Sequence, residues 1–481
     1  MSSSKIMRNY LYNTIYQVIL LITPLITTPY VSRVLGAEGI GIYHYAQSYV
    51  TYFMMIGALG TGLYGQREIA YVQTDVKAYT RVFKEIVAIR MTLSLIGSIV
   101  FYFVFCLSGE YSFVYRVLII ELLATGIDIS WFYTGLENFK RVVIRNIIIR
   151  IVCIVSIFIF VKSEKDVIIY TICLTLPAFA GNISLWFGVR KLLDHTHEGL
   201  SMLFDGIKKR IRPIIGLFIP QIAIEVYTVL DKTMIGILGT DIAQVGYYTQ
   251  GQKLIKIVMM IITSLGTVML PAMAALYSQG DKERIKQSII KAFRFMIMMA
   301  MALIFGLIGI VYRFVPVFYG DGYDPVAILI IIISPIIFII GASNILGKQY
   351  LLPTKQQTVF TISVVSGASV NFLLNMLLIP RLNAVGASIA TVIAELTVTG
   401  IQCWYVRKEI PLIQCFKPLV KYLPLGILMC IIVRIIGRCV ENNMIALIAM
   451  IFAGAFVYIG VLFGTKDPMI QTGISFVNRK K

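Results

Sequence analysis

Charged residues are scarce in this sequence of 481 residues, of which only 14% are Asp, Glu, Lys or Arg, whereas 58% are hydrophobic. No polar stretch is long enough to form a separate catalytic domain outside a membrane. Every predicted outer loop has about ten residues or fewer. This scarcity argues against a soluble enzyme and against a membrane-embedded enzyme with a large outer catalytic loop, such as a polysaccharide polymerase.

Residues that bind metals or form redox pairs are also few. The seven cysteines are scattered and form no CxxC pair, which makes a metal or redox site unfavourable. Of the three histidines, His195 and His197 share one predicted loop, where an incidental exposed pair is favoured over a metal site. His44 differs because it lies inside a predicted membrane span. We therefore expect no cofactor.

Long apolar runs are abundant. A membrane-spanning helix needs about 20 mostly apolar residues, and the runs between charged breaks predict an all-α polytopic membrane protein with about 14 transmembrane helices. The expected spans are approximately 10–32, 39–62, 83–107, 113–135, 142–161, 167–190, 213–236, 246–276, 293–319, 325–347, 359–379, 384–406, 419–436 and 443–464.

The net charge is +19, and the basic residues behind it are distributed in accord with the predicted topology. Outside the spans, most Lys and Arg residues fall in the N-terminal tail, the even-numbered loops and the C-terminal tail, including 208–212 and 282–286. Because excess Lys and Arg mark the cytoplasmic side, both termini are expected to be cytoplasmic. Topology and attraction to anionic headgroups explain the charge, and no nucleic-acid partner is expected.

The two halves of the chain contain a weak internal repeat. Leu35-Gly36 is followed by Gly41 and two tyrosines, and some 203 residues later Leu238-Gly239 is followed by Gly246 and two tyrosines. Six spans separate the copies, so the repeat is parallel. It predicts a six-helix lobe over 1–190, a basic cytoplasmic linker over 191–212, a second six-helix lobe over 213–406, and two appended helices with a cytoplasmic tail over 407–481.

Ionisable residues within the spans suggest where a mechanism would lie. An unpaired charge at the bilayer centre costs about 2.5–3.5 kcal/mol on insertion scales, so such residues face a cavity or a partner. Asp128, Glu225 and Glu395 lie near mid-depth, where a carboxylate could couple transport to a proton or cation, or could be the fixed partner of a buried cation. Both readings stay open for each residue.

Basic residues within the spans are candidates for binding an anion. Lys253 and Lys256 are three apart and share a helix face, so they repel each other unless Glu225, Asp231 or an anionic ligand lies between them. Further basic residues in the spans are Arg90, Arg145 and Arg150. Arg145 is expected to snorkel to the membrane interface.

The first two spans also carry uncharged polar and aromatic side chains. They include two pairs spaced four apart, together with a histidine and a glutamine: Asn13 and Gln17, Tyr45 and Tyr49, His44, and Gln47. A face of this kind suits sugar recognition by hydrogen bonding and ring stacking. The alternative is hydrogen bonding between helices, each bond worth well under about 2 kcal/mol.

Six stretches, in order, carry a resemblance to a known family. They are TPYVSRVLGAEGIGIY at 28–43, YGQREIA at 64–70, WFYTGLENFK at 131–140, VLDKTMIGILG at 229–239, VGYYTQGQK at 245–253 and LIPRLNAVGASIAT at 378–391. Together they resemble the polysaccharide repeat-unit flippases (Wzx-type) of the multidrug/oligosaccharidyl-lipid/polysaccharide exporter superfamily. The resemblance covers nearly the whole chain.

The resemblance implies two six-helix lobes around a central cavity, and a substrate of oligosaccharide linked by pyrophosphate to undecaprenol. It also implies a multi-pass location in the cytoplasmic membrane of a bacterium, and a working link to a polysaccharide polymerase and chain-length machinery. Residues at family-typical positions, for which gating or structural roles are as plausible as substrate contact, are Arg67, Glu68, Trp131, Glu137, Arg145, Asp231, Lys232 and Lys253.

These observations lead to one transport hypothesis. Arg90, Arg150, Lys253 and Lys256 would line a path for the pyrophosphate, because Arg and Lys bind phosphate oxygens by charge-assisted hydrogen bonds. The sequence has no GxxxxGK[ST] loop, so an H⁺ or Na⁺ gradient, the membrane potential or downstream consumption would drive alternating access. The alternatives are a multidrug cation exporter, whose cargo a basic cavity would not suit, a lipid II flippase, and a non-transporting scaffold.

Overall fold

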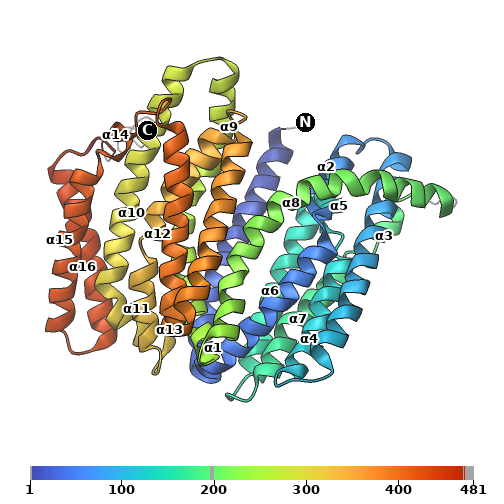
Figure 1. Ribbon diagram of the computed structural model, residues 1–481, viewed down its shortest axis with the longest axis horizontal. Helices are drawn as coiled ribbons and strands as arrows, with labels where there is room; N and C mark the ends of the chain where they lie inside the picture. Colours follow the sequence, from blue (N-terminus) through green and yellow to red (C-terminus); the bar gives the residue numbers. More distant parts are fainter. Residues whose placement is uncertain (1–2, 195–199, 470, 472–481) are drawn as a thin grey trace. The chain divides into compact units, whose positions relative to one another are not determined.

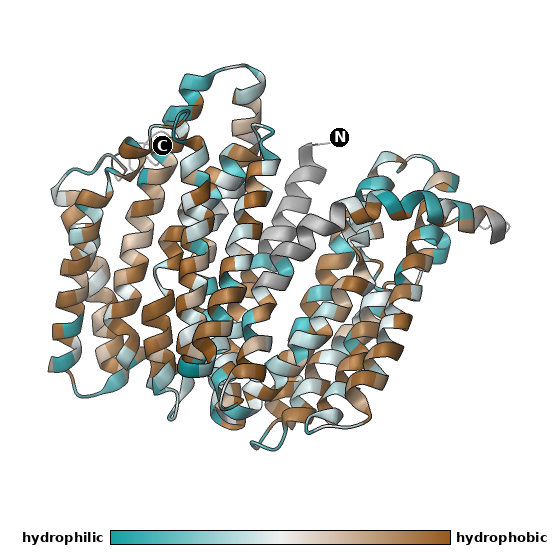
Figure 2. Cartoon of the chain, viewed as in Figure 1, coloured by the Kyte–Doolittle hydropathy of each residue, from teal (hydrophilic) through white to brown (hydrophobic). Residues whose placement is uncertain are grey.

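The computed structural model describes residues 3–194, 200–469 and 471, and these residues form helices, turns and loops without a β-strand. The chain divides into two compact units, Met1–Gly236 and Ile237–Lys481, which are described separately below (Figure 1). Within the helices of each unit, hydrophobic residues cover most of the shafts and hydrophilic residues gather at the ends (Figure 2). This distribution is that of helices surrounded by lipid.

The first unit contains eight α-helices, a π-helical segment and a short 3-10 turn among its described residues. Their bounds are α1 Ser3–Ala58, α2 Thr61–Tyr71, α3 Val76–Phe101, η1 Tyr102–Cys106, α4 Ser112–Ile127, α5 Ser130–Gly135, α6 Phe139–Phe160, α7 Val167–Ser184, η2 Val189–Lys191 and most of α8, Leu200–Leu238.

The second unit begins at the end of α8. Its elements are α9 Ala243–Ser278, α10 Lys282–Tyr319, α11 Asp324–Ile333, α12 Ile336–Ser343, η3 Asn344–Leu351, α13 Gln357–Val406, α14 Leu412–Phe416, α15 Leu419–Cys439 and α16 Asn443–Gly464. The predicted appended helices correspond to α15 and α16, which pack against α10. Arg313 of α10 donates to the carbonyls of Gly437 (2.8 Å) and Val440 (3.2 Å), and so caps the end of α15.

Nine helical stretches among the described residues are long and apolar enough to cross a membrane. Two of them, Tyr16–Tyr71 and Gln357–Val406, each contain a pair of predicted spans. The all-α, multi-pass prediction is therefore confirmed. The predicted number of fourteen spans stays a prediction, as does the orientation of the termini; α4, for example, has 16 residues, fewer than a full crossing needs.

The two long stretches are hairpins that turn on a single residue. α1 passes through Pro24 and Pro29 and leaves helical geometry at Gly36 (φ 66°, ψ 179°). Its two halves run in opposite directions from this turn (Figure 1). Glycine adopts positive φ without steric cost. α13 turns at Asn383 (φ 49°), and asparagine is one of the side chains that tolerate this region.

The internal repeat predicts a longer turn in its second copy. In the first copy the turn is the single non-helical residue Gly36, whereas in the second copy α8 ends at Leu238 and α9 begins at Ala243. Thr240, in this second turn, donates its backbone N–H to Asn383 Oδ1 (2.9 Å). Two turns far apart in the sequence are thus joined within the second unit.

The hairpin of α13 depends on a glycine three residues after Asn383. A Cβ atom at Gly386 would lie 2.6 Å from Leu378 O and 3.0 Å from Ile379 N, both backbone atoms that cannot rotate away. We expect Gly386→Ala to lower the free energy of unfolding by about 1–3 kcal/mol, the range for overpacked sites. Thermal denaturation of the detergent-solubilised protein measures the change.

Gly400→Ala in the same helix is the matched control for this prediction. Nothing lies within 4 Å of a Cβ atom at Gly400, and alanine has the higher helix propensity. The control should therefore leave the melting temperature unchanged or raise it. Equal effects of the two substitutions would contradict the argument that the hairpin requires glycine at position 386.

The predicted lobes, with a linker over 191–212 and a second lobe from 213, stay a prediction. The first compact unit extends to Gly236 and includes most of α8. The contacts explain this. Thr233 of α8 donates to Ser48 Oγ of α1 (2.8 Å), Tyr52 lies 3.0 Å from Thr233 Oγ1, and a Cβ atom at Gly236 would overlap the Tyr45 ring.

Candidate functional site

The polar residues that the sequence singles out gather in three places in the first unit. The first is a buried ion pair between α3 and the end of α4. Arg90 Nη2 lies 3.4 Å from Asp128 Oδ2, and the exposed fractions of the two side chains are 8% and 23%. Arg90 Nε also donates to Thr125 O (2.6 Å), and Nη1 lies 3.4 Å from Thr61 Oγ1.

This ion pair changes the meaning of two predictions. We predicted Arg90 for the phosphate path, and for Asp128 either ion coupling or a role as the fixed partner of a buried cation; the structure pairs the two residues. Asp128 also accepts from the backbone N–H (2.9 Å) and the hydroxyl (3.1 Å) of Ser130. A buried arginine needs an anionic partner, so a substrate phosphate would have to compete with Asp128 for the guanidinium.

The second place is the aromatic face of α1. Tyr45 and Tyr49, predicted to share a face, have hydroxyls 3.0 Å apart and rings in edge contact with centroids 5.2 Å apart. Tyr111 and Tyr115, at the start of α4, lie against the rings of Tyr45 (6.2 Å) and Tyr49 (6.3 Å) respectively. The face is therefore a cluster of aromatic rings that also carries hydroxyl groups.

The third place is a polar centre where α1, α4 and α6 meet. The Glu121 carboxylate of α4 accepts a hydrogen bond from Gln47 of α1. Tyr43 lies within electrostatic range of both Glu121 and Arg150 of α6. His44 is buried and packs edge-on against the Tyr43 ring, 4.9 Å between centroids.

Glu121 is the residue that sequence reasoning missed. Glu121 lies in the fourth predicted span but not near mid-depth by residue count, so it was not among the predicted coupling carboxylates. Its position contained a signal nonetheless. Glu121, Thr125 and Asp128 are spaced four and three apart, which places them on one helix face, and Thr125 and Asp128 both contact Arg90.

The remaining predicted residues of the first unit are spread along it. Gln17 is exposed, and the side chain of Asn13 lies outside the described residues. Arg145 of α6 donates to the Asn182 side chain of α7. Asp231 of α8 is buried and Lys232 is half-buried.

In the second unit, the predicted lysines lie on α9. Lys253 is half-buried and Lys256 is exposed. Next to them, Gln252 Nε2 donates to Tyr248 Oη (2.6 Å), which lies 3.1 Å from Thr391 Oγ1 of α13. Glu395 is four residues after Thr391 on α13, so it shares the face that packs toward α9. These contacts place the predicted carboxylate and lysines on neighbouring helices.

The predicted phosphate path includes residues of both units, two from each. Its four members therefore stay predictions as a set, and so do the coupling roles of Asp128, Glu225 and Glu395. The geometry adds that Arg90 forms an ion pair with Asp128 within the first unit.

A charged clamp holds the start of α8 on α2 and α3. Arg210 donates to the Glu85 carboxylate, lies 3.5 Å from Glu68 and donates to Tyr64 Oη (3.3 Å). Glu85 is 2% exposed. Burial by itself lowers the pKa of the Arg210 guanidinium, but the hydrogen bond and negative charge of Glu85 outweigh burial, and the pKa is raised above its usual value.

Two of the sequence stretches that carry the resemblance lie near this clamp. Glu68, which pairs with Arg67 at 3.1 Å, belongs to YGQREIA, as does Gly65. A Cβ atom at Gly65 would lie within 3 Å of the Trp131 ring, from WFYTGLENFK. The second and third stretches thus pack together near Arg210, and the gating or structural roles of Arg67 and Glu68 stay predictions.

Comparison with solved structures identifies the fold. A structure of the lipid II flippase MurJ in an inward closed conformation superposes with a TM-score of 0.76, covering 96% of this chain and 100% of that chain at 15% identity. An inward-facing transporter of the multidrug resistance MATE family, in the MOP superfamily, matches with a TM-score of 0.59 over 82% of this chain and 95% of that chain, at 12% identity. The fold is that of MOP-superfamily membrane transporters.

Sequence comparison identifies the family. Residues 6–277 match the family described as "Polysaccharide biosynthesis protein", and the chain belongs to this family. A relative from Escherichia coli (strain K12), named "Putative O-antigen transporter", is 24% identical over 84% of this chain and 97% of its own length. A protein of the same name from Shigella dysenteriae is 22% identical over 78% of this chain and 93% of its own length. The resemblance read from the six sequence stretches is confirmed.

Proposed function

We propose that this protein flips undecaprenyl-pyrophosphate-linked oligosaccharide repeat units from the cytoplasmic to the outer leaflet by alternating access, for synthesis of a cell-surface polysaccharide such as capsule, O-antigen or exopolysaccharide. One observation carries the proposal: this chain matches, over 84% of its length and 97% of the relative's, a protein named "Putative O-antigen transporter". The proposed role is transport rather than catalysis.

The chemistry of such a substrate fits the residues of this chain. Two phosphates cannot cross hydrocarbon without compensating cations, and Lys253, Lys256 and Arg150 are basic residues of predicted spans that could supply them. The aromatic hydroxyl face of Tyr45 and Tyr49 suits sugar rings, which stack on aromatic side chains and hydrogen-bond through their hydroxyls.

Coupling to an H⁺ or Na⁺ gradient is proposed without any bound cofactor. Glu225 and Glu395 remain candidates, and Glu121 joins them because Gln47 bonds its carboxylate between α1 and α4. Asp128 is the weaker candidate, since protonating it would leave the buried cation Arg90 without its anionic partner. A downstream polysaccharide polymerase would receive the translocated unit.

A flipping assay in proteoliposomes tests the proposal. We expect labelled lipid-linked oligosaccharide to become accessible in the opposite leaflet, and we expect Lys253→Ala with Lys256→Ala to reduce the rate at least tenfold, about 1.4 kcal/mol of lost phosphate binding. The matched control is Lys282→Ala with Lys291→Ala, which removes two exposed lysines from α10 of the same unit and should leave the rate unchanged.

The same assay separates the alternatives. The fold similarity to MurJ makes lipid II a competing cargo, and faster flipping of lipid II than of the oligosaccharide lipid would favour that function. Transport of an amphipathic cation with no flipping of either lipid would favour a multidrug exporter. Unchanged flipping in the double lysine variant would remove the phosphate path while leaving the flippase assignment intact.

A further inference from the structure

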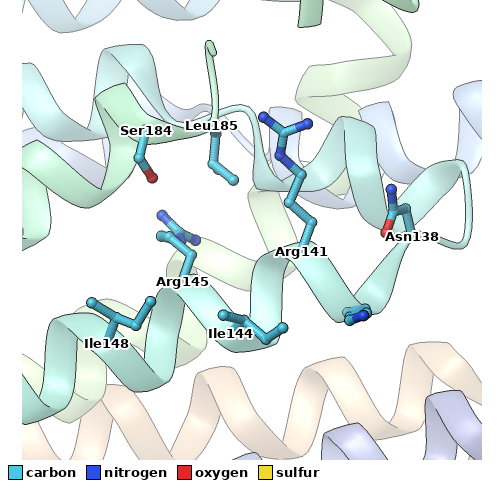
Figure 3. Close-up of a pocket in the computed structure, with 8 residues that line it drawn as sticks. Asn138, Arg141, Ile144, Arg145, Ile148, Ser184 and Leu185 are labelled. Atoms are coloured by element: carbon cyan, nitrogen blue, oxygen red, sulfur yellow. The ribbon is translucent and has the colours of Figure 1, made fainter. Parts of the chain in front are cut away.

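A basic groove lies between the start of α6 and the end of α7. It has a volume of about 370 Å³, within the range of small-molecule sites. Figure 3 shows Arg141, Arg145 and the Ile144 side chain projecting from α6, with Ser184 and Leu185 across from them. The lining residues are Asn138, Lys140, Arg141, Ile144, Arg145, Ile148, Ser184 and Leu185. Three of the eight are cations and none is acidic.

The two arginines of the groove are held in place by the protein. Arg141 donates to Phe187 O, and its guanidinium lies 4.7 Å from the centroid of the Tyr133 ring. Arg145 donates to Asn182 Oδ1, and Asn182 in turn donates to Ala124 O (2.7 Å). Such anchoring reduces the conformational entropy that the side chains would lose on binding an anion.

Arg145 retains a spare donor. Its Nε–H is buried and has no hydrogen-bond partner in the part of the chain that the structure describes. A buried donor without a partner carries a desolvation cost of about 1–3 kcal/mol, which an oxygen acceptor would relieve. The guanidinium presents a fork of donors that matches phosphate oxygens.

An exposed apolar stripe continues from the groove along α6. Ile144 and Ile148 line the groove, and Ile151, Val155 and Ile159 follow at helical spacing, all of them exposed. Cations at one end and an apolar stripe below them form an amphipathic surface. A free phosphate would use only the first of these features, whereas a phospholipid would use both.

The groove lies at the basic end of the first unit. Exposed Arg190 and Lys191 follow α7 at this end, and excess Lys and Arg mark the cytoplasmic side. The cytoplasmic leaflet contains anionic lipids, which basic pockets between transmembrane helices bind through their headgroups. The charge of the groove is complementary to such a lipid.

We propose that the groove formed by Lys140, Arg141 and Arg145 binds the phosphate headgroup of an anionic glycerophospholipid from the surrounding leaflet, with one acyl chain along the α6 stripe. The site is distinct from the path proposed for the transported substrate. If this lipid-binding proposal fails, the proposed flippase function is unaffected, because the flipping assay tests that function independently.

Native mass spectrometry of the full-length protein, delipidated and titrated with phosphatidylglycerol, tests this inference. We expect one tight site with a preference for phosphatidylglycerol over phosphatidylcholine. Because each basic residue near the surface is worth about 1 kcal/mol, Lys140→Gln with Arg145→Gln should weaken this site roughly thirtyfold. Lys208→Gln with Lys209→Gln, which removes two exposed charges from α8, should not change it.

Two further variants keep the test independent of folding. Lys140 is exposed, so Lys140→Gln alone should fold and still weaken binding roughly fivefold, and Arg145→Lys should retain most of the affinity. Equal affinity for the two lipids, or an unchanged affinity in the double glutamine variant, would overturn the proposal. Displacement of phosphatidylglycerol by an equimolar undecaprenyl pyrophosphate would also overturn it, since the groove would then belong to the transported lipid.

Discussion

Removing Asp128 should destabilise the protein more than almost any other single substitution. Asp128→Ala would leave Arg90, whose side chain is 8% exposed, as a buried cation without its anionic partner. Breaking a buried ion pair in this way costs about 3–5 kcal/mol. We expect this loss in the free energy of unfolding, measured by thermal or denaturant unfolding of the purified protein in detergent.

A double variant provides the control for this expectation. Arg90→Met with Asp128→Leu removes both charges and replaces them with apolar side chains of similar volume, a change that is often neutral or stabilising for buried pairs. The double variant should be more stable than either single one. Additive losses would mean that the two charges do not interact, and would contradict the structure.

The same double variant separates a structural role from a coupling role. If the stable double variant still flips lipid-linked oligosaccharide, Arg90 and Asp128 serve the fold of the first unit. If it is stable but inactive, the predicted roles in the phosphate path and in ion coupling gain support, because loss of folding has been excluded. A flipping assay on the double variant and on the unaltered protein distinguishes these two roles.

The second large effect is expected at the clamp between α8 and α3. Arg210→Ala would leave the Glu85 carboxylate, 2% exposed, without the guanidinium that bonds it. An uncompensated buried charge again costs about 3–5 kcal/mol. We expect the start of α8 to detach from α2 and α3, with faster proteolysis there and faster amide hydrogen exchange in α8.

Arg212→Ala is the matched control for the clamp. Arg212 is exposed and lies two residues away on the same helix, so its loss changes the net charge equally and should change stability by less than about 0.5 kcal/mol. Glu85→Gln should restore part of the stability of the Arg210→Ala variant, because it removes the buried charge. A clamp variant as stable as the control would contradict the role given to Glu85.

The class, the family and the helical architecture could be read from the sequence. In lipid every backbone polar group must be hydrogen-bonded by the protein itself, so a long apolar run can only be a helix or part of a closed barrel. The runs here are of helical length. The turn at Gly36 was also visible, because its positive φ favours glycine. The equivalent turn at Asn383 lay inside the last of the six recognised stretches but was not predicted as a turn of a single residue.

The sequence did not show which polar side chains pair with each other across helices. Spacing places residues on one helix face, as it did for Tyr45 and Tyr49, but it does not say which helix that face meets. Arg90 and Asp128 are 38 positions apart, and Gln47 and Glu121 are farther apart still. Their contacts depend on the depth and rotation of each helix in the bundle.

The sequence by itself therefore determined that this chain is a multi-pass helical membrane protein of the polysaccharide biosynthesis family, because apolar length and ordered motifs are local properties. Only the tertiary structure decided that α8 belongs with the first unit, that Arg90 is paired with Asp128, and that Lys140, Arg141 and Arg145 line one groove. Those outcomes depend on how helices pack against each other, and packing is set by side chains that are distant in the sequence.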